Sequence, residues 1–150
     1  MILNELLTRQ NVITKIELKD GEKELPKELK VKIMRIRLAY NKVKKAFDED
    51  VKEFVEQIAT DEYKELAQKP ERTEEEDKRY NELNVKINSD YIEFVNQKGG
   101  EEIKDTIDDK ITEDEYAEIL DVNAGNDVDI NGQTLKAADL MEAFYELFVA

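Results

Sequence analysis

The chain has 150 residues, with 37 acidic and 23 basic side chains, a net charge of −14 at pH 7, and no His, Cys or Trp. Without His and Cys, Ser-His-Asp and Cys-His catalytic arrangements are excluded within the chain. The thiolate and imidazole ligands preferred by zinc, copper, haem and iron–sulfur sites are excluded as well, which leaves only oxygen-bound cations. The acidic balance argues against general nucleic-acid binding, and no apolar run approaches the ~20 residues that span a bilayer. We therefore expect a soluble protein with no enzymatic activity and no cofactor.

The first 18 residues have apolar side chains near helical spacing, with Asp20-Gly21 as a stop signal. This pattern predicts an N-terminal helix, although the stretch 12–18 also fits a strand. After the polar turn GEKE, Pro26 suits the first position of the next helix.

A long helix is predicted to start near Lys27, because neither Gly nor Pro interrupts the chain from there to Lys69. Apolar residues recur at steps of three and four over ~34 residues, about 50 Å of helix. This stripe consists of Leu29, Ile33, Ile36, Tyr40, Val43, Phe47, Val51, Phe54 and Ile58. Residues 60–69 could continue the helix, but Pro70 must end it.

A second long helix is predicted after the acidic linker ERTEEED. Thr73 and Glu76 have the spacing of a capping box, and Gly99-Gly100 closes the helix. Its apolar stripe consists of Tyr80, Leu83, Ile87, Tyr91 and Phe94. Two such stripes joined by a short turn predict a long antiparallel helical hairpin.

The last third of the chain is more acidic and less regular. Residues 101–111 are too polar to assign, whereas Thr112 and Glu115 repeat the capping-box pattern and open a short helix through Leu120. Residues 137–149 are predicted to be helical and are apolar on nearly every side, which indicates burial in the fold or against a partner.

The stretch DVDINGQTL, residues 127–135, fits either half of a calcium-binding loop or a β-hairpin. Asp127, Asp129 and Asn131 precede Gly132 as in an EF-hand, but the position of the closing Glu is occupied by Ala138. Alternating Val128 and Ile130 followed by Asn-Gly is the strong signal of a type I′ hairpin. The hairpin is the favoured interpretation, and weak cation binding by Asp127 and Asp129 is left open.

These elements predict a mainly α fold of α+β type. It contains a long antiparallel helical hairpin and a small C-terminal unit with a β-hairpin and a terminal helix. Residues 1–100 would form the N-terminal helix and the helical hairpin, and residues 101–150 would form an acidic unit packed on it, in one domain overall.

The charge is unevenly distributed, and this suggests contact surfaces. Residues 27–45 carry eight basic side chains and one acidic side chain, whereas residues 101–150 carry fifteen acidic and three basic ones. A polar surface of this kind can fix the orientation of subunits, although a solvated face explains the pattern equally well. The candidate partner contacts are Lys30, Lys32, Arg35, Arg37, Lys42, Lys44 and Lys45 from the basic run, and Phe144, Tyr145 and Phe148 from the terminal helix.

The order of parts over residues 1–100 resembles that of small uncharacterised proteins from structural gene clusters of tailed bacteriophages. The resemblance lies in the short leading helix, Leu25-Pro26, the run LKVKIMRIRLAYNKVKKAFDE and the returning helix. It implies a virion part or an assembly factor and supplies no catalytic residue.

The leading functional hypothesis is a structural or interaction protein of a capsid, neck or tail. It would contact copies of itself and other virion proteins, with no direct contact to nucleic acid or membrane. It would be found in the virion, or in the host cytoplasm during assembly. The alternative is an acidic decoy that inhibits a host nucleic-acid-binding protein, and this hypothesis is weakened by the interrupting basic run.

Overall fold

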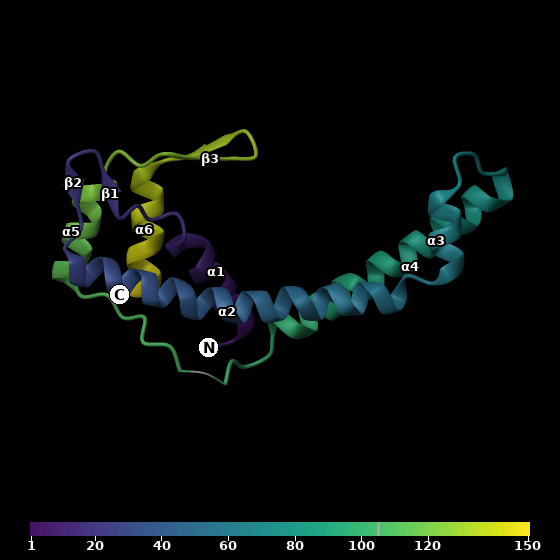
Figure 1. The fold of residues 1–150 in the computed structure, drawn as a ribbon, viewed down its shortest axis with the longest axis horizontal. Coiled ribbons are helices and arrows are strands. Elements are labelled where there is room, and N and C mark those ends of the chain that lie inside the picture. The colour runs from purple at the N-terminus through teal and green to yellow at the C-terminus, as the bar shows by residue number, and fades with distance from the viewer. Residues whose placement is uncertain (105) are drawn as a thin grey trace. The chain divides into compact units, whose positions relative to one another are not determined.

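The computed structural model describes residues 1–104 and 106–150, and its fold is mainly helical, as predicted (Figure 1). It also contains two small antiparallel hairpins, of which the sequence predicted the second. The chain forms two compact units. Unit 1 consists of Met1–Val43 and Ile103–Ala150, and unit 2 consists of Lys44–Glu102. This division differs from the expected boundary at residue 100, because the C-terminal third folds together with the first 43 residues.

Unit 1 contains most of the secondary-structure elements. These are α1 (Leu3–Ile13), β1 (Lys19–Asp20), β2 (Lys23–Glu24), the first part of α2 (Lys27–Ile58), α5 (Glu113–Asn123), β3 (Val128–Ile130), β4 (Gln133–Leu135) and α6 (Ala137–Phe148). Among the described residues between Ile103 and Thr112, none lies in a helix or strand. Backbone hydrogen bonds tie this segment down, from Ile103 N–H to Met1 C=O at 2.9 Å and from Ile111 N–H to Phe148 C=O at 2.9 Å.

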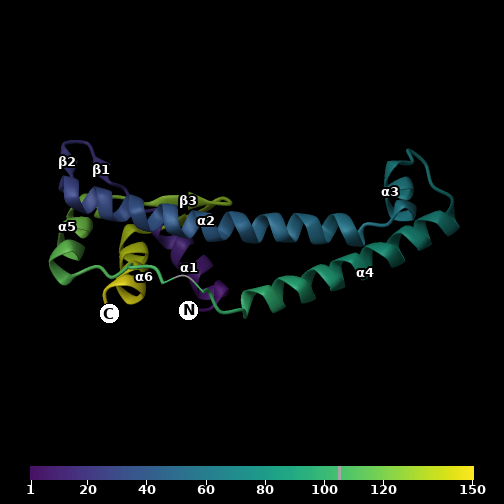
Figure 2. The same cartoon turned by 60° about the horizontal axis from the view of Figure 1, so that its bottom comes forward.

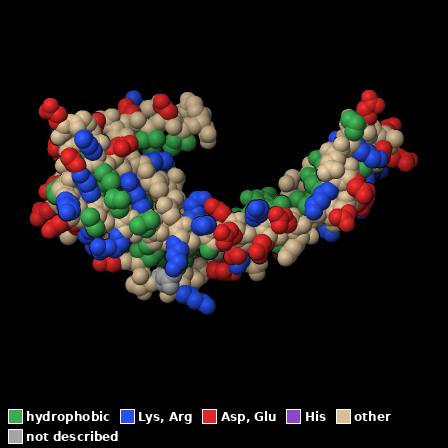
Figure 3. All heavy atoms as spheres, in the orientation of Figure 1, with side chains coloured by type: hydrophobic (Ala, Val, Ile, Leu, Met, Phe, Trp, Pro, Cys, Tyr) green, Lys and Arg blue, Asp and Glu red, His purple; other side chains and the backbone are tan. Residues whose placement is uncertain are grey.

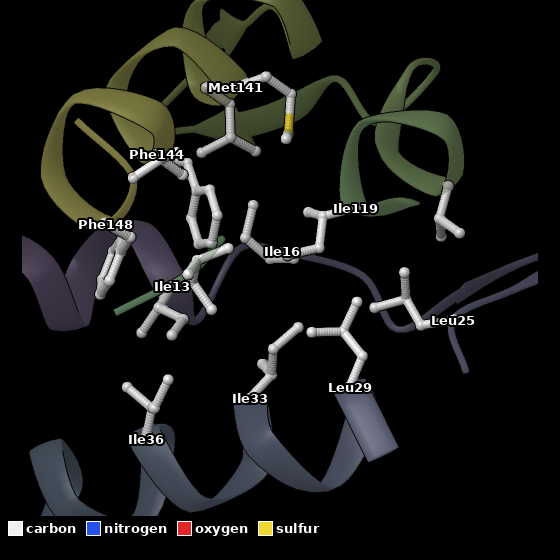
Figure 4. Packing of buried hydrophobic residues seen from close by; sticks show 14 of the residues in the cluster. Ile13, Ile16, Leu25, Leu29, Ile33, Ile36, Ile119, Met141, Phe144 and Phe148 are labelled. Carbon is white, nitrogen blue, oxygen red and sulfur yellow. The ribbon is translucent and has the colours of Figure 1, made fainter. Parts of the chain in front are cut away.

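The core of unit 1 lies between α1, α2, α5 and α6. Side chains from all four helices converge there, together with Ile16 and Leu25 from the intervening chain (Figure 4). The contribution of α2 is the first half of its apolar stripe, namely Leu29, Ile33, Ile36 and Tyr40, each at most 3% exposed. Burying each of these side chains is worth on the order of 1.5–3 kcal/mol, so this cluster supplies much of the driving force for folding.

The N-terminal helix is shorter than the sequence predicted. It ends at Ile13, where Arg37 of α2 donates from Nε to the carbonyl of Ile13 at 3.1 Å and from Nη2 to the carbonyl of Ile16. The Ile13 carbonyl also accepts from Ile16 N–H at 3.3 Å, so Arg37 adds a second bond at the end of the helix and another just beyond it. Beyond them the chain forms the β1–β2 hairpin, in which Gly21 has a φ of +62°, a value readily adopted by Gly. This hairpin was not predicted from the sequence.

The DVDINGQTL stretch is the hairpin that the sequence favoured. Strand β3 pairs antiparallel with β4, with Val128 opposite Leu135 and Ile130 opposite Gln133. Asn131 and Gly132 have φ values of +50° and +80°, as a two-residue type I′ turn requires at both central positions.

Unit 2 contains the remainder of α2, then α3 (Asp61–Gln68) and α4 (Glu74–Gly99). The separate helix α3 begins because the Thr60 side chain accepts a hydrogen bond from Tyr63 N–H, which caps a new helix instead of continuing α2. The predicted capping box at Thr73 and Glu76 opens α4. Figure 2 shows that α4 returns alongside the later part of α2, as in an antiparallel helical hairpin.

Aromatic pairs hold unit 2 together. The rings of Phe54 and Phe94 stack with their centroids 4.1 Å apart, and those of Tyr63 and Tyr80 stack at 5.4 Å. The first half of the α2 stripe is therefore buried in the core of unit 1, whereas the second half is partly buried within unit 2. Among the described residues, no helix is long and apolar enough to cross a membrane.

Candidate interaction surface

Several cations of the basic run are engaged within the protein. Lys30 pairs with Glu24, and Lys32 Nζ lies 2.8 Å from Glu115 Oε1. Arg37 is occupied by the two backbone carbonyls near the end of α1. These three predicted partner contacts therefore join elements of unit 1 to one another.

The environment shifts the pKa of two of these groups. Burial lowers the pKa of the Arg37 guanidinium, and the nearby Glu17 carboxylate partly offsets this effect. Burial raises the pKa of Glu115, but hydrogen bonds from Lys32 and from the Thr112 N–H outweigh it, so the net pKa is lowered. The environment therefore favours the charged form of Glu115, whereas burial disfavours the charged form of Arg37.

Three other cations of α2 point into solvent. Lys27, Arg35 and Lys42 are exposed, and within residues 1–104 and 106–150 none of them forms an ion pair. Lys44 and Lys45 fall in unit 2, where Lys44 Nζ lies 2.6 Å from Asp48 Oδ2. The basic run thus contributes to the surface of unit 1 three cations that are unpaired among the described residues.

Apolar side chains lie between these cations on the same helix. Val31 is 44% exposed, Met34 51% and Leu38 70%. Their spacing of three and four residues places them in one row along the helix. We call the combined surface the α2 face, and it consists of Lys27, Val31, Met34, Arg35, Leu38 and Lys42.

The α2 face is visible in space filling, where apolar side chains lie among Lys and Arg side chains over the first part of α2 (Figure 3). A pocket adjoins it and is lined in part by Arg35 and Lys42. The remaining lining residues are Ile36, Ala39, Val43, Thr106, Ile107 and Asp108. The surface therefore combines an apolar row with a hollow that two cations border.

Sequence reasoning missed the apolar half of this surface. Val31, Met34 and Leu38 lie outside the predicted core stripe of α2 and were not among the predicted partner contacts. The available signal was a second apolar row at helical spacing on another side of the same helix. Because one helix face already fills the core, a second row is left outside it.

The aromatic residues predicted to contact a partner lie inside unit 1 instead. Phe144 and Phe148 are 0% and 2% exposed, and their rings stack with centroids 4.8 Å apart. Tyr145 is half-buried, and its hydroxyl donates to Glu113 Oε1 at 2.6 Å; this hydrogen bond and the charge of Glu113 raise the tyrosine pKa. Phe144 and Phe148 thus offer no side-chain surface to a partner in this fold, because α6 packs against α1 and α5.

The carboxylates of the hairpin also have partners within the protein. Asp127 Oδ1 accepts from Ala137 N–H at 2.8 Å, at the start of α6, and Asp129 Oδ1 accepts from the Thr134 hydroxyl at 2.7 Å. The bond from Ala137 N–H lowers the pKa of Asp127, helped by nearby Lys136. In the described part of the chain, no three His, Cys, Asp or Glu side chains are grouped to hold a metal ion.

Comparison of the chain with protein-family models, with curated proteins and with solved structures finds no match in any of the three.

Proposed function

We propose that this chain is a structural or interaction protein that binds an acidic, amphipathic segment of a protein partner through the α2 face. The observation that carries the proposal is the solvent-exposed row of Val31, Met34 and Leu38. It is bordered by cations that form no ion pair with any residue the structure describes. An exposed apolar row rimmed by charge is typical of a protein–protein contact.

The two components of the face have different roles in binding. Covering the apolar row removes it from water, at roughly 25 cal/mol per Å². The cations Lys27, Arg35 and Lys42 favour an acidic partner and speed its encounter, and they orient it more than they add affinity. Because they have no ion pair in the described chain, engaging a partner breaks no existing ion pair.

The mixture of apolar and basic groups favours a protein over nucleic acid. Phosphate binding is driven by neutralising several phosphates with Lys and Arg. Here the centre of the face is apolar, and the chain carries a net charge of −14. An amphipathic helix with acidic flanks satisfies both parts of the surface at once.

The setting we propose is a bacteriophage particle or its assembly, where the partners are copies of this chain or other virion proteins. This setting is supported by the pattern over residues 1–100 and by the presence of an exposed contact surface on a largely helical unit. No reaction is included in the proposal.

The proposal is tested by titrating the ¹⁵N-labelled chain with two helical peptides of equal length, one with Leu, Ala and Glu and the other with Leu, Ala and Lys. Only the acidic peptide should shift the amide signals of residues 27–42, and it should do so in a salt-dependent way. Val31→Asn/Leu38→Asn should abolish these shifts without changing the fold. If both peptides shift the same residues, or if the acidic peptide shifts only other residues, the proposed function is wrong.

A further inference from the structure

A second exposed apolar row lies on α5, also within unit 1. Ala117, Leu120 and Ala124, the residue that caps the C-terminus of α5, are all exposed and follow one another at spacings of three and four residues. Leu120 is 40% exposed. Acidic side chains border this row on the same helix. We call this surface the α5 face, and it consists of Asp114, Ala117, Glu118, Leu120, Asp121 and Ala124.

The acids of the α5 face are poorly neutralised by the protein itself. Asp114 and Glu118 form no ion pair within the described residues. Asp121 lies 3.4 Å from Lys23, with both side chains more than half exposed, so this pair is weak. In unit 2, by contrast, carboxylates such as Glu62 have close partners, with Arg79 Nε at 2.6 Å.

The α2 face and the α5 face match in length, shape and charge. In each apolar row the last member follows the first by seven positions, which is about two helical turns or 10 Å. The α2 row carries large side chains, whereas the α5 row has one Ala residue on each side of Leu120. Large residues of one helix pack well into the spaces left by small residues of another.

A hollow beside the α5 face adds to the match. It is lined by Leu25, Pro26 and Val122 together with Glu24, Ala117, Glu118 and Asp121. Its apolar residues can receive a protruding side chain such as that of Leu38, while its carboxylates can face Arg35 or Lys42. The α5 face thus offers both features that the α2 face requires of a partner.

We propose that the α2 face of one copy of this chain binds the α5 face of a second copy. The proposal rests on the proposed function, since it names the acidic amphipathic partner as the chain itself. The two surfaces differ, so the contact is heterologous and repeats from copy to copy as a ring or an open chain, unless two copies close on each other. One contact of two helical turns is smaller than a standard interface of ~1,600 Å², so each contact is weak.

The test uses two charge-reversed variants of the full chain. Arg35→Glu/Lys42→Glu reverses the α2 face, and Asp114→Lys/Asp121→Lys reverses the α5 face, with both pairs seven residues apart. Lys64→Glu/Lys78→Glu is the matched control, because it makes the same charge change as the first variant at exposed residues outside both faces. Circular dichroism establishes that each variant is folded.

Sedimentation velocity at ~50 mM salt is run over protein concentrations from about 20 µM to 1 mM, a range suited to a small, weak interface. The natural chain and the control should associate, and each reversed variant should associate at least about tenfold more weakly. An equimolar mixture of the two reversed variants should recover association, because each supplies a surface complementary to the other.

The outcomes separate this inference from the proposed function. A natural chain that stays monomeric up to the highest concentration overturns the self-association, while the acidic peptide still tests the α2 face. If the α2 variant loses association while the α5 variant associates normally, the α5 face is not what binds the α2 face. The α2 face itself then remains a contact surface. A mixture of reversed variants that stays monomeric overturns the pairing of the two faces.

Discussion

The side chain of Asn123 binds both backbone polar groups of Glu17. Its Oδ1 accepts from Glu17 N–H at 2.8 Å, and its Nδ2 donates to Glu17 C=O at 3.0 Å. Nδ2 also donates to the carbonyl of Ile119 at 2.9 Å, and Oδ1 accepts a further bond from Asn126. Asn123 is 0% exposed and is the one buried polar side chain among the described residues. It therefore ties α5 to the chain between α1 and β1 in the way that a neighbouring strand would.

Replacing Asn123 by Leu should destabilise unit 1 by about 2–4 kcal/mol, because the backbone N–H and C=O of Glu17 lose their partners in a part-buried place. Urea unfolding followed by residue-resolved NMR would measure the loss in unit 1 separately from unit 2. Asn88→Ala, at an exposed site of α4, is the control and should stay within about 0.5 kcal/mol of the natural chain. Equal stability of the two variants would contradict the role of Asn123.

Tyr40 is predicted to make the protein sensitive to alkali. Its hydroxyl donates to Asp109, which also lies 2.9 Å from Arg9 Nη1. Burial first, and then the bond to Asp109, raise the pKa of Tyr40 above its ordinary value of 10.0. The folded state therefore holds this proton more tightly than the unfolded state does. The resulting stability is fully present below about pH 10 and is lost as pH rises toward the folded pKa.

Tyr40→Phe should therefore lower stability at pH 7 by on the order of 1.5–3 kcal/mol, the contribution of a hydrogen bond to a charged group. Between pH 10 and 12 its stability should fall less steeply than that of the natural chain. Urea unfolding at a series of pH values measures both effects. Parallel pH profiles for the two proteins would show that Tyr40 is not the group responsible.

The turn at Asn131-Gly132 is predicted to need Gly for conformational reasons alone. Gly132 has a φ of +80°, and a Cβ added there would meet no atom within 4 Å. Gly132→Ala should therefore cost about 1–2 kcal/mol through backbone strain. Gly125→Ala is the matched control, because a Cβ there also meets nothing and its φ is not in the left-handed region. This second change should be neutral or slightly stabilising in thermal unfolding. Equal effects of the two changes would contradict the turn assignment.

Asp127 is predicted to act as a helix cap. Removing its carboxylate in Asp127→Ala leaves the Ala137 N–H without its partner and should lower the melting temperature at pH 7. The pKa of Asp127 is depressed below 3.8, so the stability it contributes is present above that pH and is lost as pH falls through the folded pKa. The difference between variant and natural chain should therefore shrink in acid. A calorimetric titration should show no saturable calcium heat, and micromolar binding lost in this variant would contradict the capping role.

Local patterns predicted the regular elements well. The capping boxes at Thr73 and Thr112 open α4 and α5 as expected, and Asn131-Gly132 makes the predicted turn. These signals act within a few residues, so the sequence displays them directly. The predicted end of α1 was wrong, because the helix ends where Arg37, more than twenty residues further along the chain, binds the carbonyl of Ile13.

The division into units was beyond the reach of periodicity. The apolar stripe of α2 looks continuous from Leu29 to Ile58, and nothing in its spacing marks where one core ends and the next begins. Tertiary contacts decide where one unit ends and the next begins. Examples are the hydrogen bond from the Tyr40 hydroxyl to Asp109 and the stacking of the Phe94 ring on Phe54. The same limit hid the α2 face, since a helix's exposed row is known only once its buried row has been placed.

Phe148 and Leu38 provide the last prediction, because they separate folding from association. Phe148 is 2% exposed, packs beside Phe144 and has Arg9 5.4 Å from its ring centre, whereas Leu38 is 70% exposed on the α2 face. Phe148→Ala should destabilise unit 1 by about 3–5 kcal/mol, through lost burial and the cavity left behind. Deletion of residues 144–150 removes both buried Phe side chains and should unfold unit 1.

Leu38→Ala should change stability by less than about 0.5 kcal/mol, while weakening binding of the acidic peptide and association of the chain. NMR-detected urea unfolding and sedimentation velocity measure the two effects. A Phe148→Ala variant that keeps its stability would place α6 outside the core, and a Leu38→Ala variant that associates normally would remove the apolar row from the contact.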